Sequence, residues 1–303
     1  MSAEPASGAS PDRIAVLGLG LMGRPLARTL LAAGHDVVGW NRSALAPPLV
    51  EGIPLAGSLG EAAERDVLVL MLADSSAVDA VLSALDGHLR AGQLVVDMGS
   101  SEPWRSEAHA ARLEARAVGW VDAPVSGGPE GAARGSLAIM VGGRERDVER
   151  AWPLLLALGT GPVRVGGPGA GHTAKLANQA IVGVLISATA EALALAERAG
   201  LDPGLVLDAL RGGSADTRIT NVQGRRMVAR DYEPRAYATT LVKDLATAAE
   251  LARRVGMRLP TVDRVLELGR ELVAAGEGSE DFAALHRLRL EDGPASDGPG
   301  GVR

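Results

Sequence analysis

The chain has 303 residues, of which 47% are hydrophobic and only 2% aromatic, and its formal net charge is −6. This length favours two domains, and the acidic balance argues against a nucleic-acid partner because no basic surface is available to neutralise phosphates. The absence of cysteine excludes disulfides, thiolate metal ligands and a cysteine nucleophile, and it is compatible with a cytoplasmic protein.

The first half of the chain alternates between short apolar strands and helices. Residues 1–11 are small or polar and lack the apolar run of a signal peptide, so we expect a disordered leader there. Alternating strands and helices predict right-handed βαβ units in a parallel sheet that is covered on both faces. The predicted strands are 13–17, 36–40, 67–71, 94–97, 120–122, 137–141 and 163–165.

The second half of the chain is predicted to be helical. A helix of about 172–199, roughly 40 Å long, would join two domains. Its apolar stretch, 180–195, is interrupted by polar residues and too short to span a bilayer, so we expect a buried helix and no membrane partner.

The expected fold class is therefore α/β, with two domains and two disordered ends. An N-terminal Rossmann domain, a doubly wound parallel sheet, would occupy residues 12–168. An all-α domain would occupy residues 169–291, joined to the first by the long interdomain helix. The Gly/Pro-rich residues 292–303 would form a disordered tail.

A glycine-rich turn joins the first predicted strand to the first predicted helix. In this setting Gly18 permits the tight turn, Gly20 lets a pyrophosphate approach the backbone, and Gly23 allows close helix–strand contact. Free backbone N–H groups and the helix dipole would bind the anion, which predicts a dinucleotide site. The complete turn is Gly18, Leu19, Gly20, Leu21, Met22 and Gly23.

The end of the second strand distinguishes between the two nicotinamide cofactors. An NAD site usually places a carboxylate about 20 residues beyond the glycines, whereas this chain has Asn41, Arg42 and Ser43. Arg42 can pair with a 2′-phosphate, and Asn41 and Ser43 can donate hydrogen bonds to it. A charge-assisted bond of about 1.5–3 kcal/mol corresponds to roughly a tenfold to hundredfold preference. We predict NADP, with NAD less favoured; the alternative is that Arg42 is an ordinary solvated loop residue.

Four further segments follow the glycine turn: VVDMGSSEP (95–103), DAPVSGG (122–128), GAGHTAKLANQ (169–179) and Lys243-Asp244. Together with GLGLMG they resemble, in order and spacing over residues 12–290, the β-hydroxyacid dehydrogenase family. That family includes enzymes of the 3-hydroxyisobutyrate dehydrogenase, tartronate semialdehyde reductase and glyoxylate/succinic semialdehyde reductase type. The resemblance implies hydride transfer between NADP(H) and a small carboxylate-bearing hydroxy- or oxo-acid, and a homodimer or homotetramer.

Lys175 is the candidate general acid/base. Reducing a carbonyl requires a proton for the oxygen as hydride reaches the carbon, and the reverse direction requires a base. Lys175 lies near the start of the predicted long helix, where apolar neighbours could partly desolvate it. Gln179 at i+4 shares its helix face, and Asn178 at i+3 is a rival for orienting the amine or the substrate. The resemblance implies the same roles, although the family usually has Asn-Asn at 178–179; the alternative is an exposed surface lysine.

The DAPVSGG segment supplies a candidate site for the substrate carboxylate. Ser126, Gly127 and Gly128 offer a hydroxyl and exposed N–H groups after a strand end, and such a loop can hold a carboxylate by several short donors. The resemblance implies the same role. An ordinary β-turn is the alternative.

Other cofactor contacts are implied by the resemblance alone. Ser100 would lie near the nicotinamide ribose, although Gly99 replaces a serine often found before it. Leu72 and Ala73 would lie over the cofactor, with Ala73 in place of the family's proline. Lys243 would reach toward the cofactor from the helical domain; a helix-surface ion pair near Asp244 is the alternative.

The sequence indicates no other type of catalytic site and leaves two alternative functions open. The five histidines show no HxxxH or HxH spacing, so no metal site is expected, and no GxSxG elbow indicates a serine hydrolase. An imine reductase of the same fold is one alternative, because GLGLMG and WNRS resemble its cofactor half, although such enzymes usually place Asp or Tyr where Lys175 stands. A non-catalytic NADP-binding sensor is the other.

Overall fold

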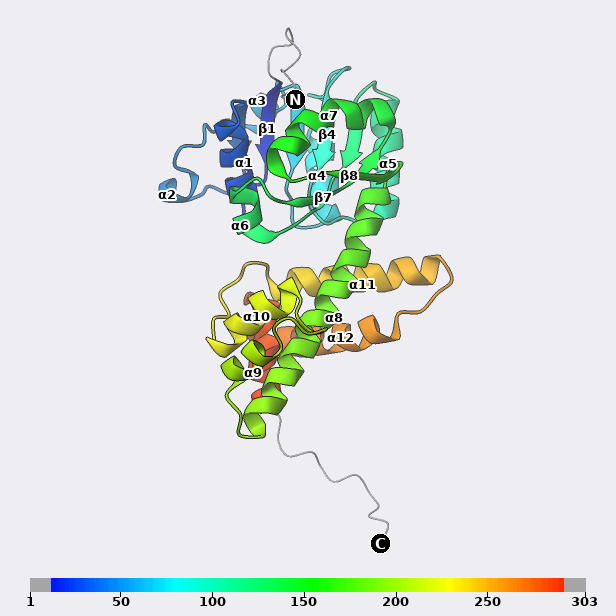
Figure 1. The fold of residues 1–303 in the computed structure, drawn as a ribbon. Coiled ribbons are helices and arrows are strands. Elements are labelled where there is room, and N and C mark those ends of the chain that lie inside the picture. Colours follow the sequence, from blue (N-terminus) through cyan, green and yellow to red (C-terminus); the bar gives the residue numbers. More distant parts are fainter. Residues whose placement is uncertain (1–11, 292–303) are drawn as a thin grey trace, which may run out of the picture. The chain divides into compact units, whose positions relative to one another are not determined.

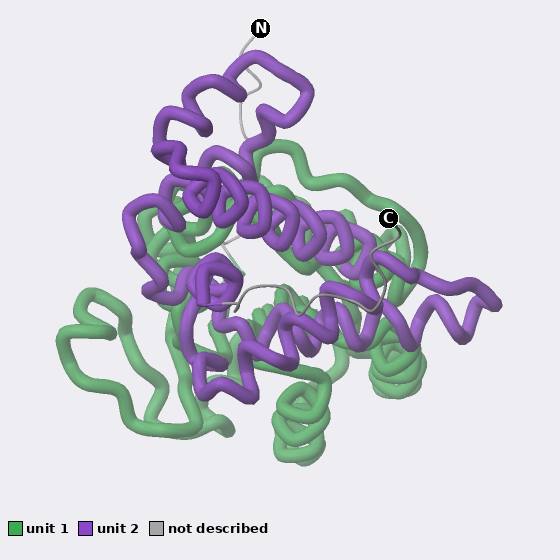
Figure 2. The backbone as a smooth tube through the Cα atoms, turned by 90° about the horizontal axis from the view of Figure 1, so that it is seen from below, with its two compact units in different colours: residues 1–175 green, residues 176–303 purple. Residues whose placement is uncertain are grey.

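The computed structural model describes residues 12–291 (Figure 1). The leader and tail expected at 1–11 and 292–303 lie outside the described residues. Residue contacts divide the chain into two compact units, residues 1–175 and 176–303, which are coloured separately in Figure 2. The division falls inside helix α8 (Ala170–Arg198), a continuous 29-residue helix that contains the predicted long interdomain helix apart from its last residue. The predicted domain boundary between residues 168 and 169 stays a prediction.

The first unit is built on a sheet whose strand order is β2-β1-β3-β4-β5-β7-β6, with β8 paired to β7. Strands β1 to β5 are all parallel, which is the Rossmann arrangement that the alternating pattern predicted. The strands are β1 (Arg13–Leu17), β2 (Asp36–Trp40), β3 (Val67–Leu70), β4 (Leu94–Asp97), β5 (Gly119–Asp122), β6 (Val125–Ser126), β7 (Ala138–Gly143) and β8 (Val163–Gly166).

The far edge of the sheet departs from the all-parallel expectation. Strand β7 runs antiparallel to both β5 and β6, and β8 follows the direction of β7. Between β6 and β7 the chain forms only the short helix α6 (Gly128–Ala133), so the strands on either side of it pair as an antiparallel ladder instead of through a full crossover.

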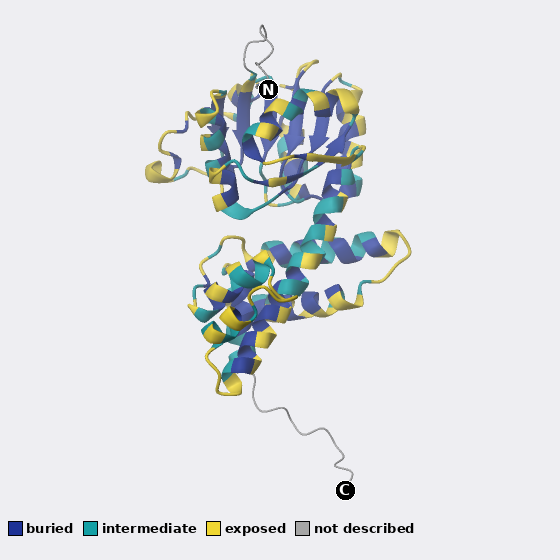
Figure 3. Ribbon diagram, viewed as in Figure 1, coloured by how far each residue is buried: buried dark blue, intermediate teal, exposed yellow. Residues whose placement is uncertain are grey.

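Two apolar cores cover the faces of this sheet, as the dark blue strands in Figure 3 illustrate. Along β1, Ile14 and Val16 join the core formed with helices α1 (Gly23–Ala32) and α7 (Glu145–Leu158), while Ala15 and Leu17 join the core formed with α4 (Ser75–Ala84) and α5 (Pro103–Glu114). Side chains alternate between faces along a strand, so continuous apolar strands can serve both cores. The short helices α2 (Pro47–Val50) and α3 (Leu59–Ala62) complete the unit.

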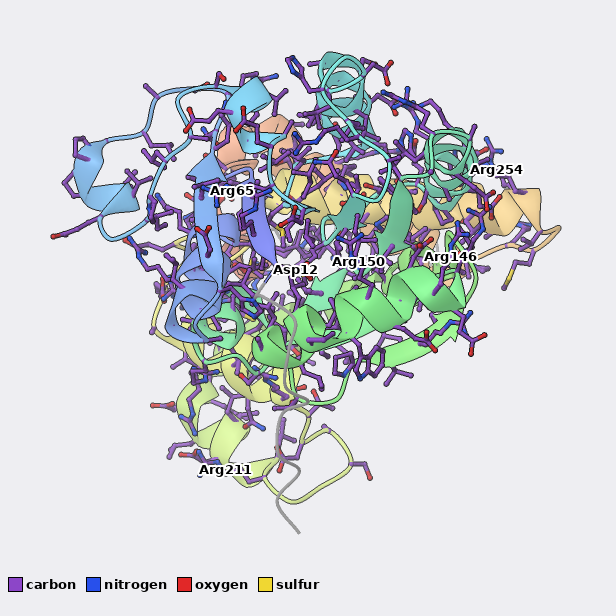
Figure 4. The ribbon with its side chains drawn as sticks, turned by 90° about the horizontal axis from the view of Figure 1, so that it is seen from above. Asp12, Arg65, Arg146, Arg150, Arg211 and Arg254 are labelled. Atoms are coloured by element: carbon purple, nitrogen blue, oxygen red, sulfur yellow. The ribbon has the colours of Figure 1, made fainter. Side chains whose placement is uncertain are left out.

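Two ion pairs lie at the amino ends of the strands. Arg65, just before β3, has its Nη1 2.6 Å from Oδ2 of Asp36 in β2. Arg150 of α7 has its Nη2 3.9 Å from Oδ1 of Asp12, just before β1; Figure 4 labels Asp12, Arg65 and Arg150. The carboxyl ends of the strands, in contrast, carry the predicted cofactor and substrate segments, as expected for an open parallel sheet.

The described residues of the second unit, 176–291, form helices joined by loops. Its core includes Leu241 and Leu245 of α11 (Ala238–Arg254) with Leu266 of α12 (Pro260–Leu272) and the aromatic ring of Phe282. Beyond α8 its elements are α9 (Pro203–Ala209), α10 (Arg218–Val228), α11 (Ala238–Arg254), α12 (Pro260–Leu272), the π-helical turn Val273–Glu277, the 3₁₀ turn Phe282–Ala284 and α13 (Leu285–Glu291).

Helix α8 corrects one sequence argument. The sequence predicts that the apolar stretch is too short and too interrupted to span a bilayer. Helix α8, however, has 29 residues and an 18-residue window with a mean hydropathy of 1.7, so length and composition alone would permit a membrane span. Ile186, Ala190 and Leu193, spaced by helical turns, are instead buried in the core of the second unit. That buried face, and not the length, supports the expected core helix.

Candidate functional site

The glycine turn of the first unit has a distinct local environment at each glycine. Gly18 has φ +102°, and a Cβ placed on it would lie 2.3 Å from the Met71 carbonyl oxygen. A Cβ on Gly23 would lie 1.8 Å from the Gly18 carbonyl oxygen, so the start of α1 packs directly on the turn. Around Gly20, no atom lies within 4 Å of a built Cβ, and the residue is exposed. The turn therefore presents open backbone where a pyrophosphate would approach.

The end of β2 is tied to this turn by one side chain. Asn41 Oδ1 accepts a hydrogen bond from the Leu19 N–H (3.1 Å), and Asn41 Nδ2 donates to the Ser43 carbonyl oxygen (2.8 Å). The hydrogen bond from Asn41 to a 2′-phosphate stays a prediction; in the structure its amide binds the glycine turn and the Ser43 carbonyl oxygen. Arg42 is exposed, and within residues 12–291 its guanidinium has no hydrogen bond or ion pair. The guanidinium of Arg28, in contrast, donates hydrogen bonds to the carbonyl oxygens of residues 49 and 51.

The loops after β3 and β4 carry the other predicted cofactor residues of the first unit. Leu72 is half-buried and Ala73 is exposed after β3, while Ser100 is half-buried after β4. Gly99 explains one departure from the family pattern: a Cβ there would lie 3.0 Å from the Leu72 carbonyl oxygen. A serine at this position would require the two loops to separate by a few tenths of an ångström.

The predicted carboxylate loop occupies the end of β6. Ser126 pairs with Ala138 of β7 and is half-buried. Gly127 and Gly128 follow with φ of 137° and 67°, in the left-handed range that L side chains rarely adopt. These conformations turn the chain into α6 directly after the Ser126 hydroxyl.

Lys175 lies in the second turn of α8, and the start of that helix is packed against the sheet. A Cβ on Gly171 would lie 2.4 Å from the Asp122 carbonyl oxygen and 2.5 Å from the Met140 carbonyl oxygen, so only glycine fits between β5 and β7 there. Asp122 Oδ1 accepts from the Gly169 N–H (2.8 Å) and Oδ2 from the His172 N–H (3.0 Å). The sheet thus fixes the first turn of α8, and Lys175 stands one turn later, half-buried.

The predicted residues of the second unit form a hydrogen-bonded chain. Asn178 Nδ2 donates to Gln179 Oε1 (3.0 Å), and Gln179 Nε2 donates to Asp244 Oδ2 (2.7 Å). Lys243 Nζ lies 2.9 Å from Asp244 Oδ1, so the ion pair considered as an alternative for Lys243 is present. The Asp244 side chain is 2% exposed and holds both partners. Asp244 and Asn178 therefore fix the orientation of the Gln179 amide, which lies one helical turn beyond Lys175.

Four buried polar residues lie outside the set of site residues that the sequence predicts: Asp97, Asp122, His172 and Asp244. Asp97 and Asp122 end strands β4 and β5, and a buried aspartate at a strand's carboxyl end was a signal that could have been used. Burial raises the pKa of the Asp122 carboxyl, while His172 and two backbone N–H groups oppose that shift. Among the described residues, no group of three or more His, Asp or Glu side chains is placed to hold a metal ion.

Comparisons with known proteins cover both units. Residues 13–167 match the family described as the NAD binding domain of 6-phosphogluconate dehydrogenase, and residues 169–289 match that described as NAD-binding of NADP-dependent 3-hydroxyisobutyrate dehydrogenase. The chain is 37% identical over 281 residues to 2-hydroxy-3-oxopropionate reductase of Escherichia coli K12, covering 90% of this chain and 95% of that one.

Solved structures show the same similarity. The crystal structure of 3-hydroxyisobutyrate dehydrogenase from Salmonella typhimurium superposes with a TM-score of 0.84 at 31% identity, covering 91% of this chain and 99% of that one. The structure of Psf3 in complex with NADP+ and 2-OPP also gives a TM-score of 0.84, at 25% identity, covering 91% of this chain and 99% of that one.

Proposed function

The chain belongs to the β-hydroxyacid dehydrogenase family, and from that premise we propose that it uses NADP(H), with Lys175 as general acid/base, to reduce a small oxo-acid or semialdehyde. At the coarser level it is an NAD(P)-dependent dehydrogenase that acts on CH–OH groups and interconverts hydroxyacids and semialdehydes.

The position of Lys175 carries this proposal. Asp122 and the backbones of β5 and β7 hold the first turn of α8 at the carboxyl end of the sheet, where the cofactor turn also lies. NADPH, when bound, supplies the hydride. Lys175 donates a proton from Nζ to the carbonyl oxygen in reduction and accepts one from the hydroxyl group in oxidation. Asn178 and Gln179, on the adjoining turn, orient the amine or the substrate oxygen.

The substrate carboxylate is assigned to the loop of Ser126, Gly127 and Gly128. A hydroxyl and successive N–H groups in a chain with positive φ values form a concave donor surface that suits an anion. Short acids with a carboxylate close to the carbonyl are the expected substrates, in keeping with the reductase of E. coli to which the chain is similar.

NADP is the proposed cofactor because of Arg42. Its exposed guanidinium follows the strand end where an NAD site would carry a carboxylate, and the backbone of the glycine turn leaves room for the pyrophosphate. The match to the NADP-dependent dehydrogenase family and the similarity to Psf3, solved with NADP+, support the same choice.

A substrate panel tests the activity. NADPH oxidation is followed with glyoxylate, succinic semialdehyde, 2-hydroxy-3-oxopropionate and a cyclic imine, and each assay is repeated with NADH. We expect turnover of at least one oxo-acid or semialdehyde with NADPH. Turnover of the imine alone would assign the chain to the imine reductase alternative. No turnover with retained NADPH binding would assign it to the sensor alternative.

The Lys175→Ala variant tests the acid/base role. Removing a positioned general acid should lower kcat by about 10²–10⁴-fold, while NADPH binding, measured by fluorescence titration, stays within twofold. Glu191→Gln, a charge change at an exposed position of the same helix, is the control and should keep full activity. A Lys175→Ala enzyme with normal kcat would remove Lys175 from the mechanism.

Assembly and location are also proposed. We expect a homodimer or homotetramer in the cytoplasm, and sedimentation equilibrium of the full chain measures the assembly directly. A monomer at micromolar concentration would contradict this expectation.

A further inference from the structure

Three buried ionisable side chains meet beneath the start of α8. Asp97 ends β4, Asp122 ends β5, and His172 lies in the first turn of α8; all three side chains are 0% exposed. His172 Nε2 lies 3.6 Å from Asp97 Oδ2, and His172 Nδ1 lies 3.9 Å from Asp122 Oδ2. One imidazole therefore separates two carboxylates inside the first unit.

Each carboxylate holds a different segment of the proposed site. Asp97 Oδ1 accepts from the Gly99 N–H (3.0 Å) and Oδ2 from the Ser101 hydroxyl (2.8 Å), which fixes the loop that carries Ser100. Asp122 accepts two backbone N–H groups at the start of α8, which fixes the turn before Lys175. The two aspartates are thus the anchors of the cofactor loop and of the acid/base helix.

The His172 ring is the group that connects these two anchors. Neither ring nitrogen reaches hydrogen-bond geometry with any partner in the part of the chain that the structure describes, yet each nitrogen faces one carboxylate. Burial and the charge of Asp97 raise the pKa of the Asp122 carboxyl, and His172 opposes that shift. Removing the ring would leave the two buried carboxylates without a group between them, and two like charges in a dry interior disfavour ionisation. One or both anchors would then lose the acceptor strength that holds their segments.

We propose that His172 is a positioning residue, which couples the loop after β4 to the first turn of α8 through Asp97 and Asp122 and so sets where Lys175 stands relative to the cofactor loop. The proposal rests on the proposed function, in which Lys175 transfers the proton. His172 lies three residues before Lys175, so a shift of its turn carries Lys175 with it. A misplacement of about 1 Å can cost a catalytic step roughly 10²-fold.

The ionisable surroundings of the cluster come from four elements. Strand β4 contributes Asp97 and strand β5 contributes Asp122. Helix α8 carries Lys175 on its next turn. Helix α5 contributes His109, whose pKa is affected by the charge of Asp97, and Glu107, whose Oε1 would lie 3.2 Å from a Cβ built on Gly169.

The test compares His172→Leu, which removes both ring nitrogens, with His172→Gln, which keeps one amide at similar length. Ser101→Ala weakens only the Asp97 anchor and leaves the histidine in place. His286→Gln is the matched control, because His286 is equally buried and pairs with Glu197 (3.0 Å) within the core of the second unit. The readouts are kcat, KM, the pH profile of kcat, the Kd for NADPH and Tm.

We expect kcat to fall about 100-fold in His172→Leu and about tenfold in His172→Gln and Ser101→Ala, with NADPH Kd within twofold. The pH midpoint of kcat should move in the His172 variants, whereas His286→Gln should change Tm only. If the leucine variant does not fold, the glutamine and Ser101→Ala variants decide.

Two results would overturn the proposal: an unchanged kcat and pH profile in these variants, or a change confined to KM and Kd. A failure of the proposed function would give a different result, because the Lys175→Ala variant would then retain normal turnover.

Discussion

At the residue level, cofactor choice and substrate chemistry depend on a few side chains whose surroundings differ sharply. Asn41 and Arg42 are adjacent, but the amide of Asn41 is bound to the glycine turn while the guanidinium of Arg42 extends into solvent. From the sequence, Arg42 is expected to pair with a 2′-phosphate and Asn41 to donate a hydrogen bond to it. The residue types at the strand end are visible in the sequence, whereas the hydrogen bonds that the Asn41 amide makes within the fold are not.

Replacing Arg42 should therefore change cofactor selectivity without changing the fold. In Arg42→Ala, loss of a charge-assisted contact of about 1.5–3 kcal/mol should raise KM for NADPH roughly tenfold to hundredfold, and KM for NADH should stay nearly constant. Arg112→Ala, an exposed arginine on α5 outside the glycine turn, is the control. Equal effects on both cofactors would show that Arg42 does not recognise the 2′-phosphate.

At the element level, the parallel strands and the long helix were predictable because both have strong apolar patterns. The antiparallel β7 was not, because an apolar strand has the same pattern in either direction and only the short connection through α6 decides. The buried anchors Asp97 and Asp122 escaped notice for a related reason: whether a polar residue at a strand end faces solvent or a helix start depends on packing from distant parts of the chain.

The glycine turn offers a sharp comparison between two neighbouring positions. In Gly20→Ala, the new methyl has open space, so Tm should be unchanged, but it would occupy the approach of the pyrophosphate. Loss of one or two phosphate contacts should raise KM for NADPH about tenfold or more.

In Gly23→Ala, the methyl would lie 1.8 Å from the Gly18 carbonyl oxygen. Overpacking there should cost about 1–3 kcal/mol of stability and lower Tm. The reverse pattern, a stable Gly23→Ala and an unstable Gly20→Ala, would contradict this account of the turn.

At the level of the whole molecule, each unit contains a buried histidine that resists protonation. Burial lowers the pKa of His109 in the first unit, against the opposing charge of Asp79. Burial and then the Arg230 guanidinium lower the pKa of His286 in the second unit, against the opposing charge of Glu197. Two separately packed cores therefore share one response to acid, although no sequence pattern relates the two residues.

Acidification should consequently destabilise both units. Below the ordinary histidine pKa of 6.5 the unfolded chain binds protons that the folded chain does not yet bind, so the free energy of unfolding falls as pH falls. Above this pH the contribution of the two neutral histidines to stability is fully present. Asp122, whose pKa is raised, contributes with the opposite sign, so the measurement compares variants with the parent chain. His109→Gln and His286→Gln should each flatten the decline of Tm between about pH 7 and pH 5. His88→Gln, at an exposed position, should leave it unchanged. If all three variants follow the slope of the parent chain, neither buried histidine controls the acid response.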